Sequence, residues 1–225
     1  GLGDVYKRQQ EIPGVEAVVL SGPSHAEEVA RNIPTVVVVG AKKFKVALKV
    51  QNLFANKVFR TYISPDRKSI ELGGSLKNVI ALAAGIIDGL GFGDNTEAAL
   101  ITRGIKEITQ LGVEMGGNAK TFYGLSGIGD LIVTCNSKHS RNRRAGVLIG
   151  KGYTLDEAVK EVKMVVEGAV SAKAALELAR KYNVSVPIIE AVNQVLFEGK
   201  PAIDGMWELM EREQTNEYRD LQWDE

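Results

Sequence analysis

The spacing of apolar residues divides the chain into two regions that meet near Pro65. In the first region, short runs of β-branched residues are separated by segments of helical period. These runs predict strands over Glu16–Ser21, Pro34–Gly40 and Val58–Ser64. Strands that alternate with helices at this spacing are typical of a doubly wound sheet, so we expect the first region to form part of one.

Two helices are expected between these strands. Ser24 and Glu27 have the spacing of a capping box, in which a helix begins after the serine. Lys43–Asn56 has the pattern of a basic amphipathic helix. Its inward face is predicted to contain Val46, Val50, Leu53 and Phe54.

Helical periods dominate the second region. Leu72–Leu90 is apolar on nearly every face, which predicts a buried central helix. Further helices are predicted to begin at Asp94, at the capping box of Thr154 and Glu157, and at Pro187, the last of these ending before Gly199. Leu131–Cys135 fits a strand or a helix. The sequence therefore predicts an α/β part followed by an all-α domain.

Composition narrows the class of protein. The chain has 225 residues, with 28 basic and 28 acidic side chains, so its net charge of zero argues against binding to nucleic acid or to an anionic membrane. Its single cysteine, Cys135, fits a reducing compartment. We find no membrane span of about 20 apolar residues and no signal peptide, and we expect a cytoplasmic protein.

The first nine residues, GLGDVYKRQ, differ from the rest of the chain. They do not begin with Met, and they have no periodicity or apolar face. We therefore interpret residues 1–9 as a non-native leader and exclude them from the fold.

Lys77 is the strongest candidate for chemistry. It lies in an apolar helical segment, GGSLKN, three residues after paired glycines that allow close approach of a ligand or backbone. A partly desolvated ammonium can act as a general acid or base. The alternative is a lysine whose stem packs while its charged end reaches water.

Three other motifs suit anion binding, each with a structural alternative. The turn SGPS at residues 21–24 precedes a helix, and its N–H groups can bind an anion or simply begin the helix. The segment GLSGIGDL at residues 124–131 is Gly-rich but lacks the dinucleotide spacing, and it also fits an interhelical loop. The segment SRNRR at residues 140–144 suits bidentate phosphate binding or a solvated basic face. Neither His25 nor His139 has metal-ligand spacing.

Taken in order, the motifs resemble those of bacterial NAD(P)-dependent glycerol-3-phosphate dehydrogenases. The motifs are SGPSHAEEVA, ELGGSLKNVIALAAGIIDGLGFGDNT, GLSGIGDLIVTC, SRNRR and MVVEG, and the similarity extends from Glu11 to about Glu211. The resemblance implies a Rossmann-type domain followed by a helical substrate domain. It also implies interconversion of dihydroxyacetone phosphate and sn-glycerol 3-phosphate with NAD or NADP, in glycerophospholipid precursor synthesis.

The resemblance assigns roles residue by residue. Lys77 matches the catalytic proton donor and acceptor. Substrate contacts match Gly22, Ser24, Lys77, Asp130, Ser140, Arg141 and Asn142, with Asn78 and Thr134 close by. Cofactor contacts match Ala26, Arg141, Val165 and Glu167. No metal is implied, and a homodimer is compatible with the family.

The resemblance also implies a division of the chain. Residues 10–69 match the C-terminal part of the dinucleotide-binding domain, and residues 70–225 match the helical substrate-binding domain. The first βαβ unit, with its Gly-rich turn for the pyrophosphate, has no counterpart in the chain. We therefore expect this chain to be inactive alone.

Two alternatives stay open at this point. Another lysine-using dehydrogenase, for 6-phosphogluconate or a hydroxyacid, would share the two-domain plan, although SRNRR and GLSGIGD argue against it. A non-catalytic anion-binding or dimerisation module would agree with the absent cofactor half, although Lys77 within its set of motifs argues against that.

Overall fold

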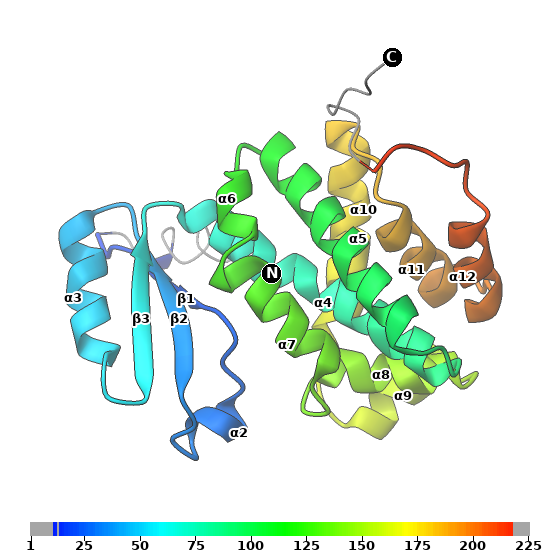
Figure 1. Cartoon of the computed structure of the whole chain (residues 1–225), viewed down its shortest axis with the longest axis horizontal. Coiled ribbons are helices and arrows are strands. Elements are labelled where there is room, and N and C mark those ends of the chain that lie inside the picture. The colour runs from blue at the N-terminus through cyan, green and yellow to red at the C-terminus, as the bar shows by residue number, and fades with distance from the viewer. Residues whose placement is uncertain (1–10, 13, 218–225) are drawn as a thin grey trace.

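The computed structural model describes residues 11, 12 and 14–217, and it consists of a small sheet beside a larger group of helices (Figure 1). The leader expected at residues 1–9 lies outside the described residues. An α/β part followed by a helical domain is the predicted architecture, and the structure confirms it.

The sheet has three strands in the order β1 (Val19–Ser21), β2 (Thr35–Gly40) and β3 (Phe59–Ser64). β2 and β3 are parallel, with Val37 opposite Thr61, whereas β1 is antiparallel to β2, with Leu20 opposite Val39. The side chains of Val37 and Val39 are fully buried. All three predicted strands are therefore confirmed, and the sheet is mixed.

Helices α2 (Ala26–Val29) and α3 (Phe44–Phe54) correct two details of the prediction. α2 begins after His25 without a side-chain cap, because the Ser24 hydroxyl donates instead to the carbonyl of Gly22 at 2.9 Å. The capping box at Ser24 was therefore wrong. On α3, Leu53 and Phe54 are 77% and 43% exposed, so their predicted inward direction was also wrong.

α4 (Arg67–Gly89) is the central helix of the second region. Asp66 caps its first turn by accepting a hydrogen bond from the Ser69 backbone N–H at 3.1 Å. The helix is long and apolar enough to cross a membrane by length and composition, but 78% of its apolar window is buried inside the protein. Its apolar character is accounted for by the helices packed around it, as predicted for a buried core helix.

The remaining helices are α5 (Asp94–Glu114), α6 (Ala119–Phe122), the π-helical segment η1 (Leu125–Gly129), α7 (Asp130–Asn136), α8 (Arg141–Gly150), α9 (Leu155–Val162), α10 (Glu167–Tyr182), α11 (Pro187–Phe197) and α12 (Ala202–Met210). Most of them pack against α4, whereas α9 contacts α8, and α12 contacts α11 and α8 (Figure 1). The predicted capping box of Thr154 and Glu157 is present. The ambiguous segment Leu131–Cys135 is helical and belongs to α7.

α4 and α8 are in unusually close contact because glycines face each other across them. A Cβ on Gly85 would lie 2.0 Å from the carbonyl oxygen of Arg143, and a Cβ on Gly146 would lie 2.1 Å from that of Leu82. Gly89 and Gly150 repeat the arrangement one turn further along. Only glycine permits the two backbones to approach this closely. The close approach fixes where α8 begins relative to α4.

Candidate functional site

A cavity of about 250 Å³ lies where the sheet meets the helical domain. One wall is the chain from the end of β1 to the start of α2, and the other is formed by α4 and α7. Its lining residues are Leu20, Ser21, Gly22, Ser24, His25, Gly74, Lys77, Asp130, Val133 and Thr134. The lining is mostly polar, which suits a small polar ligand.

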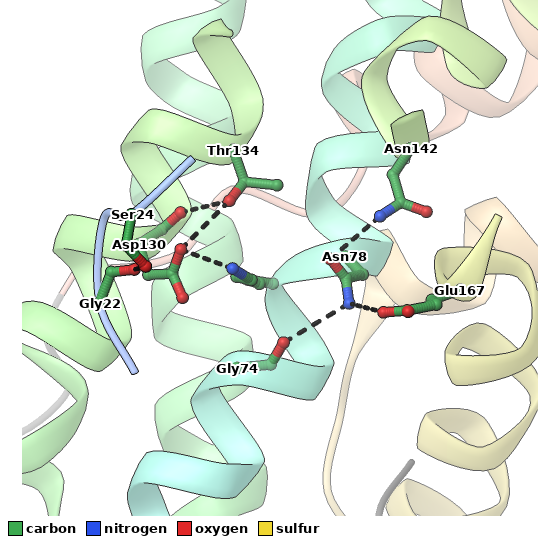
Figure 2. A network of polar contacts seen from close by, with 9 residues as sticks. Gly22, Ser24, Gly74, Asn78, Asp130, Thr134, Asn142 and Glu167 are labelled. Atoms are coloured by element: carbon green, nitrogen blue, oxygen red, sulfur yellow. Dashed lines mark hydrogen bonds and ion pairs between the residues drawn. The ribbon is translucent and has the colours of Figure 1, made fainter. Parts of the chain in front are cut away.

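Lys77 and Asp130 form an ion pair in this cavity, with 2.5 Å between Nζ and Oδ1. The Lys77 side chain is 19% exposed and that of Asp130 is 6% exposed. The Thr134 hydroxyl lies 2.6 Å from the Asp130 carbonyl oxygen, to which it donates, and 3.4 Å from Oδ1 (Figure 2). The pair is thus held between two helices and still faces the cavity.

Burial raises the pKa of the Asp130 carboxyl above its usual range, and the charge of Lys77 opposes that rise. The direct contact with Lys77 favours the carboxylate form of Asp130. The arrangement can therefore hold Lys77 as an ammonium that is ready to donate a proton to a ligand atom.

Two local features of the sequence position this pair. Gly73 allows the backbone of η1 to approach α4, since a Cβ there would lie 2.7 Å from the Ser126 carbonyl oxygen. η1 then passes directly into α7, whose first residue is Asp130. The Gly-rich segment is therefore a π-helical turn rather than a loop. π-helical turns are frequent at functional sites.

A second polar cluster lies beside the cavity, where α4 meets the starts of α8 and α10. The Asn142 amide donates to Asn78 Oδ1 at 3.0 Å, and its own oxygen accepts from the Gly168 backbone N–H at 2.8 Å. The Asn78 amide donates in turn to a carboxylate oxygen of Glu167 at 3.4 Å, and Figure 2 marks this contact with a dashed line. Arg141 makes a long ion pair of 3.9 Å with Glu167.

The other expected site residues lie partly in the cavity lining, partly at the start of α8 and partly on the surface. Gly22 and Ser24 line the cavity. Ser140 is buried and is the N-cap of α8, where its hydroxyl accepts from the Arg143 N–H at 3.3 Å. Ala26 is exposed at the start of α2, and Val165 is exposed just before α10.

His25 is a cavity residue that the sequence interpretation missed. It was considered only as a metal ligand, yet it lines the same cavity as Lys77 and Asp130. Its place directly after Ser24 in the SGPS turn was the available signal. Among the described residues, no group of three potential ligands could hold a metal ion.

Models of known protein families match most of the chain and identify its family. Residues 66–206 match the model described as the NAD-dependent glycerol-3-phosphate dehydrogenase C-terminus. The chain belongs to the NAD-dependent glycerol-3-phosphate dehydrogenase family. Residues 4–47 match the model for the N-terminus of the same family.

Relatives within the glycerol-3-phosphate dehydrogenase family are similar over nearly the whole chain. The glycerol-3-phosphate dehydrogenase [NAD(P)+] of Agathobacter rectalis is 65% identical over 215 residues, which are 96% of this chain and 64% of the relative. That of Fusobacterium nucleatum is 62% identical, with the same coverage. The chain therefore spans about 64% of the length of these curated relatives.

Solved structures of the family have the same fold. Glycerol-3-phosphate dehydrogenase from Coxiella burnetii has a TM-score of 0.87 at 38% identity, covering 91% of this chain and 63% of that one. The yeast enzyme has a TM-score of 0.82 at 28% identity, covering 92% and 62%. The Rossmann-type remnant followed by a helical domain is thus confirmed.

Proposed function

We propose that this chain carries the substrate site of an oxidoreductase that interconverts dihydroxyacetone phosphate and sn-glycerol 3-phosphate with NAD or NADP. The observation that carries the proposal is the Lys77–Asp130 ion pair, buried but open to a polar cavity between the two parts of the chain. A ketone reduction needs a proton donor at the carbonyl oxygen, and an ammonium held in this way meets that need.

Lys77 acts at the C2 oxygen of the substrate. As an ammonium it donates a hydrogen bond to the ketone oxygen, stabilises the negative charge that develops there, and transfers its proton as the alcohol forms. Asp130 keeps Lys77 oriented through their ion pair. In the reverse direction neutral Lys77 accepts the proton.

Arg141 holds the phosphate. Among the described side chains, its ion-pair partner is Glu167 at 3.9 Å, and this long contact leaves its guanidinium N–H groups available for bidentate contacts. Asn142 acts differently, because both ends of its amide are engaged by Asn78 and Gly168. It fixes the start of α8 against α4 and α10, and thereby positions Arg141 and Ser140 near the substrate.

A nicotinamide cofactor supplies or accepts the hydride at C2 when bound. The residues expected to contact it are compatible with that role, since they lie on the surface rather than in the core. Val165 is 67% exposed, Ala26 is exposed, and the Arg141 and Glu167 side chains are partly exposed. Val165 would pack on an apolar part of the cofactor, and Arg141 would contact an anionic part.

We further propose a cytoplasmic protein whose ligands are a small phosphate compound and the dinucleotide, and whose assembly is a homodimer. The balanced net charge of the chain supports the absence of nucleic-acid and membrane partners.

The test of the proposed function is Lys77→Met in an assembled enzyme. The N-terminal segment of the Agathobacter rectalis relative would be placed before this chain, and cofactor oxidation would be followed with dihydroxyacetone phosphate. We expect Lys77→Met to lower turnover at least roughly a hundredfold, because general acid catalysis is lost. This chain without the added segment is expected to be inactive.

The matched control is Lys68→Met, which removes the same charge from the same helix. Lys68 is exposed and donates to the Met115 carbonyl oxygen, outside the cavity. The control should keep near-normal turnover, and circular dichroism should show both variants folded. Equal turnover in Lys77→Met and Lys68→Met would rule out the proposed role of Lys77.

A further inference from the structure

His25 is fixed in the cavity wall by its backbone. It precedes α2, and its carbonyl oxygen accepts hydrogen bonds from the N–H groups of Glu28 and Val29, each at 3.0 Å. The ring lies 6.1 Å from the ring of His139, between centroids, and lines the same cavity as Lys77 and Asp130. His25 therefore has a defined place in the wall of the cavity that contains the proposed catalytic pair.

The Nε2 atom of His25 is buried without a hydrogen-bond partner among the described residues. An unsatisfied buried polar atom is costly, and native proteins rarely keep one without a reason. Because this atom belongs to a residue that lines a polar cavity, a ligand in the cavity is the natural source of its partner.

The charged residues that line the cavity indicate which chemical group of a ligand would pair with Nε2 of His25. Among the lining residues, Lys77 and Asp130 carry opposite full charges and are already paired. A phosphate dianion placed there would meet the buried carboxylate of Asp130, and Arg141 is not among the lining residues. An uncharged hydroxyl has no such penalty and can both donate and accept.

We propose that Nε2 of His25 is the hydrogen-bond partner of the substrate's terminal hydroxyl, at the end opposite the phosphate. This inference rests on the proposed function, and it makes His25 a residue that determines specificity for a hydroxymethyl group. With Lys77 at the C2 oxygen and Arg141 at the phosphate, His25 completes the recognition of a three-carbon substrate.

The test uses the chain's histidine content. The chain has two histidines, so the imidazole NMR signals of the protein come from His25 and His139 alone. The protein, His25→Phe, His25→Gln, Lys77→Met and the control His139→Phe would each be titrated with glycerol 3-phosphate, with inorganic phosphate, and with propane-1,2-diol 1-phosphate, which lacks the terminal hydroxyl.

We expect glycerol 3-phosphate to shift the His25 signals and to bind about two- to tenfold more weakly to His25→Phe, the range for one neutral hydrogen bond. His25→Gln should keep the affinity within about twofold, because its amide places a polar atom near the position of Nε2. The analogue without the hydroxyl and inorganic phosphate should bind His25→Phe and the unmodified protein equally. His139→Phe should change nothing.

Two results would overturn the inference and leave the proposed function intact. One is equal binding of glycerol 3-phosphate to the unmodified protein and His25→Phe, with binding still dependent on Lys77. The other is a loss of inorganic phosphate binding in His25→Phe, which would place the phosphate at this end. Glycerol 3-phosphate binding that is absent, or unaffected by Lys77→Met, would contradict the inference and the proposed function together.

Discussion

Arg141 is the residue through which phosphate recognition can be tested separately from proton transfer. It begins α8, and its guanidinium is partly exposed beside Glu167. In the assembled enzyme, Arg141→Ala should weaken discrimination between dihydroxyacetone phosphate and dihydroxyacetone by about 1.5–3 kcal/mol, because a charge-assisted hydrogen bond is lost. The ratio of kcat/KM for the two substrates measures this.

The control for Arg141 is Arg144→Ala, on the same helix and exposed. It should leave the ratio unchanged, and Arg141→Lys should restore it only in part, because an ammonium lacks the planar fork of Arg. Equal loss on both substrates in Arg141→Ala would instead indicate a role in folding or cofactor binding.

Glu107 gives the protein a pH-dependent stability that is independent of the site. Burial raises its pKa to about 8, although its carboxylate accepts hydrogen bonds from the N–H groups of Ile188 and Ile189 at 2.8 and 3.2 Å. A raised pKa means that the folded state retains a proton that the unfolded state releases. The free energy of unfolding should therefore fall as pH rises from about 4.5 to about 8, by a few kcal/mol.

Urea unfolding at pH 5 and pH 7.5 measures this dependence. Glu107→Gln should remove most of it, because the amide does not titrate, whatever its effect on absolute stability. Glu114→Gln, exposed on the same helix, should keep it. The same dependence in Glu107→Gln and the unmodified protein would show that other groups cause it.

At the scale of elements, the contact between α4 and α8 decides where Arg141 and Asn142 lie. In Gly85→Ala the new methyl would meet the Arg143 carbonyl, so the helices must separate. We expect a loss of about 1–3 kcal/mol in the free energy of unfolding. Gly93→Ala, where a Cβ meets open space, should cost much less. Similar losses in the two variants would contradict the proposed packing.

Elements with a strong period were predictable from the sequence, and elements defined by their neighbours were not. The buried helix around Leu72–Leu90 and the strand Thr35–Gly40 follow from their own composition. Leu53 and Phe54 have the spacing of an inward face but lie exposed, because the face that α3 buries depends on the sheet and not on its own period. Ser24 failed as a cap because its hydroxyl bonds within its own turn.

The same distinction applies to the site. Lys77 was identifiable as a charge in an apolar helix, and the family motifs added Asp130. Their pairing depends on η1, a π-helical turn that no local pattern predicted. The unpartnered nitrogen of His25 could be recognised only when the cavity was known, because it is defined by what surrounds it.

At the scale of the whole molecule, the site depends on how the sheet sits against the helices. The cavity takes one wall from each part, and β1 contacts α4 while β2 contacts η1. The chain spans about 64% of its relatives' length, and the proposed hydride transfer depends on how the full protein completes the dinucleotide site. Substrate recognition, by contrast, is a property of residues present in this chain.

The most direct measurement is a crystal structure of this protein with glycerol 3-phosphate. We predict the ligand in the cavity between β1 and α4, with its C2 oxygen within hydrogen-bond distance of Lys77 Nζ, about 2.6–3.2 Å. Its phosphate should contact Arg141. A ligand bound elsewhere, with Lys77 and Asp130 still closed on each other and the cavity holding solvent, would contradict the proposed substrate site.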